Sequence, residues 1–229
     1  MRYYGYFLLL IFLAACSAKP EKQAPANNTP ATEQPTDAAE PREAPKVMAP
    51  SQEDEQRTEW QNPELVIQRL GNLEDKVVAD LGAGSGYFSF KLSQLAERVI
   101  ALDIDPRALD YIEGQMDIVG DWSKNIETRL TPADVPNLVD NEVDVVLIVN
   151  TLAFIPDRAK YLPRVLQGMR AGGKLAIVDF KTGSMPVGPS DNLKLAPRQV
   201  IKELRQAGFK RVNQDETSLQ YQYIITAEK

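Results

Sequence analysis

The chain has 229 residues, of which 43% are hydrophobic, and a formal net charge of −6 at pH 7. This length suits one ordinary α/β domain with additional segments, and the negative charge provides no broad basic surface, so we expect no nucleic-acid partner. The chain contains no histidine and one cysteine. These counts exclude histidine general bases, Ser-His and Cys-His nucleophiles, intramolecular disulfides and cysteine-rich zinc sites, and we expect no metal.

Residues 1–15 have the pattern of an export signal. Arg2 gives a short positive start, and residues 3–15 are uncharged and mostly apolar. This run is too short for a typical membrane-spanning helix of about 20 residues but suits the hydrophobic part of a signal peptide. Its end, LAAC at 13–16, resembles the lipobox of bacterial lipoproteins. The resemblance implies cleavage before Cys16 and acylation of its thiol, which would anchor the chain to a membrane. The alternatives are an uncleaved anchor and a plain secretory signal with an unrelated cysteine.

A proline-rich segment follows the cysteine. Residues 17–50 contain seven prolines and no aromatic residue, so they cannot bury enough apolar surface to offset chain entropy, and we predict a disordered tether. We therefore divide the chain into a signal peptide at 1–15, a lipidated cysteine and linker at 16–55, and a globular domain at 56–229. Ser17, at the place where aspartate favours inner-membrane retention, favours the outer membrane, with the domain facing the periplasm.

The globular part begins with a predicted helix and then an unusual strand and turn. The helix covers 64–70, after Asn62 and Pro63, which suit a cap and a first helical position. Residues 77–81 are apolar apart from their acid, as a buried strand requires, and three alternating glycines and a helix to about residue 95 follow. Glycine permits a sharp turn and close approach of a ligand to the backbone. A strand, a glycine turn and a helix together form a nucleotide-binding unit, whose helix start offers backbone N–H groups to a ligand.

The spacing of these glycines indicates which ligand is bound. A dinucleotide fingerprint has the spacing G-x-G-x-x-G, but Tyr87 occupies its third glycine position here, which weakens an interpretation as an NAD-dependent oxidoreductase. The pattern present is D-x-G-x-G-x-G, formed by Asp80, Gly82, Gly84 and Gly86. It resembles motif I of the class I methyltransferases. The resemblance implies S-adenosylmethionine as cofactor, methyltransferase activity (EC 2.1.1) and cofactor contacts by these four residues.

The rest of the domain alternates strands and helices. In chain order we predict a strand at 98–103, a helix at 106–119, strands at 126–130 and 143–149, a helix at 157–169 closed by Gly172 and Gly173, a strand at 174–180, a helix at 197–207 ended by Gly208, and two strands near 211–212 and 220–226. Such alternation indicates an α/β fold with a doubly wound, mostly parallel sheet. The last two strands have no helix between them, which suits an antiparallel ending. The class I methyltransferase fold, which is Rossmann-like, has seven strands and this ending.

In a doubly wound sheet, ligands bind beyond the carboxyl ends of the strands, so the residues that follow each strand are candidates for the site. Asp103 ends the second strand and is suited to accept hydrogen bonds from both ribose hydroxyls, and Ile104 is placed to pack on adenine. The resemblance further implies that Asp134 meets the adenine amino group, that the N–H of Val135 meets a ring nitrogen, and that Asn150 lies beside the methionine part of the cofactor and the substrate. A purely structural role is the alternative for each residue.

No catalytic residue is assigned. Methyl transfer from a sulfonium is an in-line displacement, to which an enzyme contributes mainly alignment and desolvation. Many small-molecule methyltransferases carry a histidine after the fourth strand, where this chain has Leu-Ala-Phe at 152–154. Asp179, Lys181 and Tyr87 lie near strand ends, but no spacing assigns a role to any of them.

Two classes of function follow. The first is a lipid-anchored methyltransferase of the bacterial cell envelope that acts on an unidentified acceptor. The second is a non-catalytic envelope lipoprotein that uses the same fold as a ligand-binding or interaction module. The second stays open because S-adenosylmethionine is made in the cytoplasm, whereas a lipoprotein faces the periplasm or the exterior.

Overall fold

The computed structural model describes residues 52–229, with side chains described from residue 57 onward. The export signal, Cys16 and nearly all of the predicted linker lie outside the described residues. No helix in the described part is both long and apolar enough to cross a bilayer.

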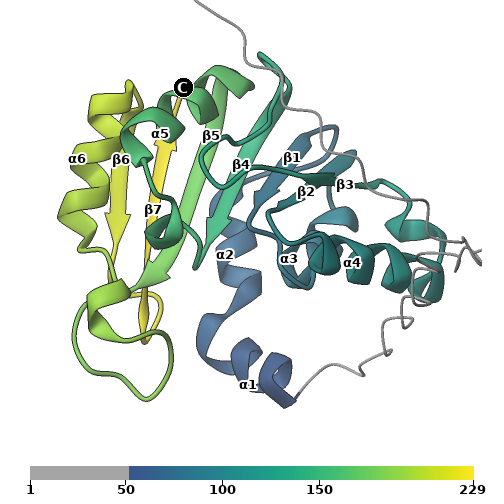
Figure 1. Ribbon diagram of the computed structural model, residues 1–229, viewed down its shortest axis with the longest axis horizontal. Helices are drawn as coiled ribbons and strands as arrows, with labels where there is room; N and C mark the ends of the chain where they lie inside the picture. The colour runs from purple at the N-terminus through teal and green to yellow at the C-terminus, as the bar shows by residue number, and fades with distance from the viewer. Residues whose placement is uncertain (1–51) are drawn as a thin grey trace, which may run out of the picture. The chain divides into compact units, whose positions relative to one another are not determined.

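A seven-stranded sheet with the order β3-β2-β1-β4-β5-β7-β6 forms the centre of the described part (Figure 1). The strands are β1 (Val77–Leu81), β2 (Arg98–Asp103), β3 (Ile126–Leu130), β4 (Val143–Val149), β5 (Met169–Phe180), β6 (Lys210–Asp215) and β7 (Gln222–Glu228). The helices are α1 (Gln52–Gln61), α2 (Pro63–Leu70), α3 (Tyr87–Ser93), α4 (Pro106–Val119), α5 (Arg158–Gly168) and α6 (Pro197–Ala207).

The pairing of the strands confirms the predicted fold class. Strands β1 to β5 pair in parallel, whereas β7 is antiparallel to both β5 and β6. In the register, Leu81 of β1 lies opposite Leu102 of β2 and Ile148 of β4. The carboxyl ends of β1, β2 and β4 therefore lie at one level, which brings together the residues that follow them.

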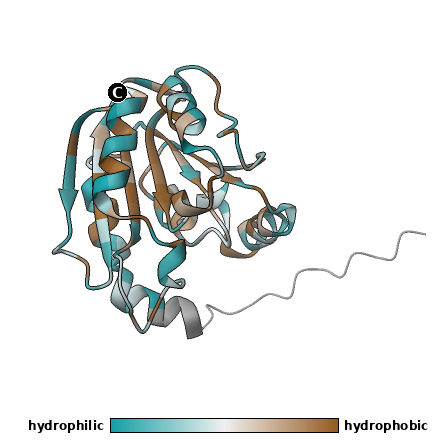
Figure 2. Ribbon diagram, turned by 60° about the vertical axis from the view of Figure 1, so that its left-hand side comes forward, coloured by the Kyte–Doolittle hydropathy of each residue, from teal (hydrophilic) through white to brown (hydrophobic). Residues whose placement is uncertain are grey.

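Two apolar layers hold the helices on the two faces of the sheet. On one face, alternate strand residues such as Ile148 and Ile177 pack with Leu162 of α5 and Leu204 of α6. On the other face, their neighbours pack with residues of α2, α3 and α4. Figure 2 shows the central strands as largely hydrophobic and the outer helices as mixed, as this layering requires.

The helix ends follow the predicted signals. The Asn62 side chain accepts a hydrogen bond from the N–H of Leu65, with Pro63 at the first helical position of α2. Gly208 ends α6 with a φ of 102°, the left-handed conformation that favours glycine. These local signals fix where each helix begins and ends relative to the sheet.

The predicted helix end at residue 169 is wrong, as is its closure by Gly172 and Gly173. Helix α5 ends at Gly168, and β5 begins at Met169, so both glycines lie inside the strand. The pairing with β4 shifts register there, because Val143 pairs with Met169 and Val145 with Lys174. A Cβ on Gly173 would stand 2.8 Å from the carbonyl oxygen of Arg170. Glycine is therefore needed for a close backbone approach within an irregular strand.

Helix α1 was not predicted from the sequence. Its segment is strongly polar and shows no apolar periodicity, which is the usual signal of a helix that packs on a core. It is attached through its last residues: the Trp60 ring lies 5.5 Å from that of Phe180, and Gln61 is fully buried. These contacts place the end of α1 against the end of β5.

Candidate functional site

A pocket of about 240 Å³ lies at the carboxyl ends of β1, β2 and β4. Four residues predicted from the sequence line it: Gly82, Asp103, Ile104 and Asn150. The other lining residues are Thr131, Pro132, Ala133, Thr151, Phe154, Ile155 and Tyr161. The pocket is thus where the predicted fold places its ligand.

The three glycines of the turn all have positive φ but different surroundings. A Cβ on Gly82 would lie 2.2 Å from Oγ1 of Thr151, and one on Gly86 would lie 2.9 Å from Cγ1 of Ile112. A Cβ on Gly84 would have no atom within 4 Å. Gly82 and Gly86 are therefore required by packing, whereas Gly84 faces open space.

The backbone of this turn is bound to β2. The N–H groups of Gly82 and Ala83 both donate to the carbonyl of Leu102, at 2.8 and 3.0 Å. The N–H of Gly84 donates to Oδ2 of Asp103 at 2.8 Å. These three donors are engaged within the protein, so the turn itself contributes open space at Gly84.

Asp103 is a hydrogen-bond acceptor that lines the pocket. Its Oδ1 accepts from the N–H of Asp105 at 2.9 Å, and its Oδ2 accepts from Gly84. Two backbone donors therefore fix the carboxylate, and each oxygen keeps a lone pair for a further donor. A ribose diol supplies two such donors. Beside it, the side chain of Ile104 is 61% exposed and offers an apolar surface to a ligand ring.

Asp80 does not line the pocket. Its carboxylate is 2% exposed and accepts from Oγ of Ser89 at 2.7 Å. Burial raises its pKa to about 6, against the opposing effects of the Ser89 hydrogen bond and the nearby Arg57 charge. Asp80 thus holds the start of α3 under the glycine turn, and a direct contact with cofactor stays a prediction.

Asp134 and Val135 do not line the pocket either. Asp134 is exposed, and the N–H of Val135 donates to the carbonyl of Pro132 at 3.3 Å. The pocket wall that follows β3 consists instead of residues 131–133. Contacts of Asp134 and Val135 with adenine stay predictions.

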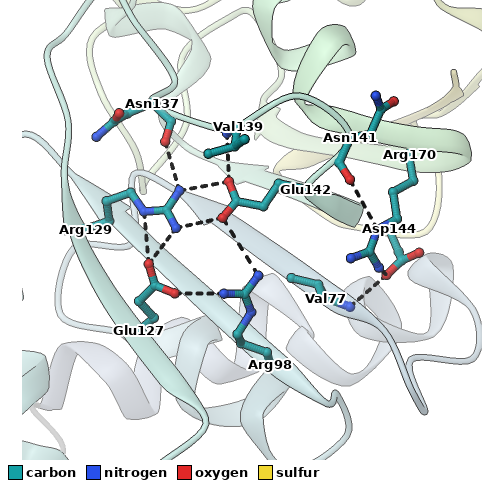
Figure 3. A network of polar contacts seen from close by, with 10 residues as sticks. All are labelled: Val77, Arg98, Glu127, Arg129, Asn137, Val139, Asn141, Glu142, Asp144 and Arg170. Atoms are coloured by element: carbon teal, nitrogen blue, oxygen red, sulfur yellow. Dashed lines mark hydrogen bonds and ion pairs between the residues drawn. The ribbon is translucent and has the colours of Figure 1, made fainter.

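A charged network holds the connection between β3 and β4 (Figure 3). Arg129 donates to both carboxylate oxygens of Glu142, at 2.9 and 2.8 Å, and to the carbonyl of Asn137. Glu142 also accepts from the N–H of Val139 at 2.8 Å. The paired geometry lowers the pKa of Glu142, chiefly through the Arg129 hydrogen bonds. Both ends of the connection that supplies residues 131–133 are therefore held.

Asn150 follows β4 in a left-handed conformation with a φ of 55°, which asparagine tolerates better than most residues. Its N–H donates to the carbonyl of Val178 at 2.9 Å, and its Oδ1 accepts from Nε2 of Gln222 at 2.5 Å. Gln222 lies at the start of β7 and is bonded in turn to Gln61 of α1. Neither Gln61 nor Gln222 is predictable as a partner of the site, because nothing in a single sequence connects residues so far apart.

The three other candidates have structural partners. The hydroxyl groups of Tyr87 and Thr58 lie 2.7 Å apart, and Lys181 donates to the carbonyls of Leu219 and Gln220. Asp179 is 3% exposed, and burial raises its pKa to about 6. None of the three lines the pocket.

The residues present fit an adenosyl ligand. Asp103 provides an acceptor for a ribose diol, Ile104 and Phe154 provide exposed apolar surface, and Gly84 leaves room for close approach. Asn150 adds a polar group on the β4 side. This is the donor, acceptor and apolar pattern that the predicted cofactor requires.

Comparisons with known proteins agree with this geometry. A family profile described as "Methyltransferase domain" matches residues 79–177. The chain is 28% identical over 135 residues to a tRNA U34 carboxymethyltransferase of Campylobacter fetus, covering 58% of this chain and 45% of the relative. It is 27% identical over 153 residues to a probable S-adenosylmethionine-dependent methyltransferase of Mycolicibacterium smegmatis, covering 64% and 57%. The chain thus spans about half the length of these curated relatives.

A solved structure is similar over most of the described part. The crystal structure of an S-adenosylmethionine-dependent methyltransferase from Aquifex aeolicus matches with a TM-score of 0.70 and 25% identity, covering 79% of this chain and 98% of that one. Together these matches confirm the predicted fold and agree with the predicted methyltransferase class of the domain and with S-adenosylmethionine as its cofactor.

Proposed function

We propose that this chain, which carries a class I methyltransferase domain, transfers the methyl group of S-adenosylmethionine to an acceptor in the bacterial cell envelope. The observation that carries the proposal is the pocket beside Gly82, Asp103 and Asn150, because it combines a fixed acceptor with an open glycine turn. The acceptor substrate is unidentified. The lipobox-like sequence that ends at Cys16 supports the envelope part of the proposal, as does the proline-rich segment after it.

In the proposed reaction the cofactor supplies an electrophilic methyl group on a sulfonium, which leaves as a neutral thioether. The protein's part is alignment and exclusion of water, for which effective molarities are worth about 7–11 kcal/mol. Asp103 orients the ribose through a carboxylate that two backbone N–H groups hold in place. Apolar side chains, Ile155 and the largely buried Tyr161 among them, form part of the pocket wall. No residue that lines this pocket offers a free general base, because the Asp103 carboxylate already accepts from two backbone N–H groups and orients the ribose, so the acceptor must itself be a good nucleophile.

The proposal is tested by methyl transfer. The purified full-length chain is incubated with S-adenosylmethionine labelled in its methyl group and with fractionated envelope lipids, proteins and small molecules. We expect label in one fraction with the wild-type chain and at least about tenfold less with Asp103→Ala, because hydrogen bonds to a charged group are worth about 1.5–3 kcal/mol. Binding of the cofactor without transfer to any fraction would favour a non-catalytic binding module and overturn the proposed activity.

A further inference from the structure

A chain of side-chain amides connects α1 to the pocket. Nε of Arg57 donates to Oε1 of Gln61 at 2.5 Å, and Nε2 of Gln61 donates to Oε1 of Gln222 at 3.0 Å. Nε2 of Gln222 then donates to Oδ1 of Asn150 at 2.5 Å. Gln61 and Gln222 are both fully buried. We call Arg57, Gln61, Gln222 and Asn150 the amide relay.

The direction of the amide relay is fixed at its arginine end. A guanidinium has only donors, so Gln61 must meet Arg57 with its oxygen. Gln61 is then left with its nitrogen toward Gln222, and Gln222 in turn has its nitrogen toward Asn150. Asn150 must therefore receive Gln222 with its oxygen, which leaves its Nδ2 as the free end of the amide relay. No described residue accepts a hydrogen bond from this Nδ2, and Asn150 lines the pocket.

The order of the strands indicates which part of a ligand lies next to Asn150. Asp103 ends β2, Gly82 follows β1 and Asn150 follows β4, and these strands are neighbours in that order. A ribose held at Asp103 would allow the adenine to lie toward residues 131–133 after β3, which line the same pocket. The amino-acid end of the cofactor would then extend across Gly82 toward Asn150. That end carries one acceptor group, the carboxylate, and one donor group, the ammonium.

We propose that the amide relay holds Nδ2 of Asn150 toward the pocket as a donor to the carboxylate of S-adenosylmethionine, and that Arg57 and Gln222 are the residues that position it. The inference rests on the proposed function in that it takes the same cofactor in the same pocket. It adds that α1, which no motif identifies, takes part in cofactor recognition. It also predicts that affinity for S-adenosylmethionine depends on the direction of the hydrogen bonds in the amide relay, and not only on their presence.

The test compares two ligands that differ only in the carboxylate: S-adenosylmethionine and its decarboxylated form. Dissociation constants of the full-length chain are measured by calorimetry for both. The variant Gln222→Glu keeps the size of the side chain and still accepts from Gln61, but its carboxylate cannot donate to Asn150. The Asn150 amide then turns its nitrogen to residue 222 and its oxygen to the pocket. We expect affinity for S-adenosylmethionine to fall about tenfold or more, and affinity for the decarboxylated form to change less than about threefold.

Further variants separate direction from charge and from damage to the fold. Gln220→Glu makes the same change at an exposed position outside the amide relay and should leave both affinities unchanged. At the other end, Arg57→Lys keeps a head group with donors only, Arg57→Met removes it, and Arg57→Glu replaces it with an acceptor. Preference for S-adenosylmethionine over the decarboxylated form should be highest in Arg57→Lys, lower in Arg57→Met and lowest in Arg57→Glu. Thermal unfolding of each variant shows whether it is folded.

Several outcomes would overturn the inference. Equal loss of both ligands in folded Gln222→Glu would indicate a general disturbance of the pocket, and unchanged binding would show that the amide relay does not matter. Equal preference in all three Arg57 variants would show that its direction does not matter. A wild-type chain that binds neither ligand would overturn the proposed function and this inference with it, whereas the other outcomes affect the inference alone.

Discussion

At the scale of single residues, the three glycines after β1 occupy similar positions in a motif, but these positions do not all require glycine for the same physical reason. Gly82 leaves room for Thr151, and Gly86 leaves room for Ile112 and Phe90, so both are demanded by the folded protein itself. Gly84 has open space where a side chain would stand. Its glycine is explained by its φ of 54° and by a ligand that approaches the backbone.

Gly84→Ala should therefore separate binding from folding. We expect a loss of roughly 1–2 kcal/mol in the free energy of unfolding, from the left-handed backbone conformation alone, but at least about a tenfold loss in affinity for S-adenosylhomocysteine. Gly82→Ala should lose more stability, since its Cβ would lie 2.2 Å from Oγ1 of Thr151. Urea unfolding and calorimetry measure the two effects. Wild-type affinity in Gly84→Ala would show that no ligand uses this space.

Asp179 is a second residue whose environment gives a sharp expectation. Its Oδ2 and the Tyr223 hydroxyl are buried without a hydrogen-bond partner among the described residues, and the two residues lie opposite each other on β5 and β7. Burial raises the pKa of Asp179 from 3.8 to about 6. The folded state thus holds a proton that the unfolded chain has released, so stability falls as pH rises between these two values.

Asp179→Asn should remove this dependence. A shift of that size corresponds to roughly 3 kcal/mol, and we expect the variant to gain about 1–3 kcal/mol over the wild type at pH 8. The gain should shrink as pH falls through the window from about 6 to 3.8 and disappear below it. Urea unfolding of both proteins from pH 8 to pH 3 measures the difference. A gain that is the same at every pH would show that charge burial is not its cause.

At the scale of elements, the connection between β3 and β4 shows how a loop is held in place. Arg129 and Glu142 are 19% and 11% exposed, and their two parallel hydrogen bonds hold residues that lead into the pocket wall. Because the pKa of Glu142 is lowered, its stabilising effect is present above its ordinary value of 4.5 and is lost as pH falls through the lowered value. This dependence is opposite to that of Asp179.

Glu142→Gln should weaken both the fold and the site. Replacement of the carboxylate removes charged hydrogen bonds worth about 1.5–3 kcal/mol, and we expect a loss of that order at pH 7 with weaker binding of S-adenosylhomocysteine. Glu74→Gln is the matched control, since Glu74 is exposed and no ion pair to it is found in the described part. Equal stability of the two variants by urea unfolding would contradict the role given to the Arg129–Glu142 pair.

Elements were predictable where a local signal determines them. Unbroken apolar runs at 99–102 and 145–149 lead into Asp103 and Asn150, so the ends of β2 and β4 could be located from the sequence. Helix α1 has no apolar periodicity and packs through its end, so the hydrophobic pattern of its sequence did not predict a helix. The glycines at 172 and 173 were misassigned because glycine is typical both of a close backbone approach within a strand such as β5 and of a helix end.

At the scale of the whole molecule, the limits of sequence reasoning come from long-range contacts. Gln61, Tyr161 and Gln222 reach the site or its partners from three separate elements, and their convergence depends on the complete sheet. The same holds for Asp134 and Val135, which follow the predicted strand but do not line the pocket. The order of the elements along the chain shows at which end of a strand a residue lies. Packing decides which of the side chains at that end meet the ligand.

The predicted lipid anchor is the other property of the whole chain. We expect Cys16→Ala to abolish incorporation of labelled palmitate, because the variant lacks the thiol that would be acylated. Cofactor affinity should be unchanged in the purified variant, since the pocket is built from residues after 80. Incorporation of palmitate that persists without Cys16 would contradict acylation at this residue.

Binding of S-adenosylhomocysteine to the full-length chain tests the central claim most directly. Calorimetry should show one site per chain, with affinity at least about tenfold weaker in Asp103→Ala than in the wild type. No binding by the folded wild-type chain, or equal affinity in the two proteins, would contradict the assignment of this pocket to the cofactor.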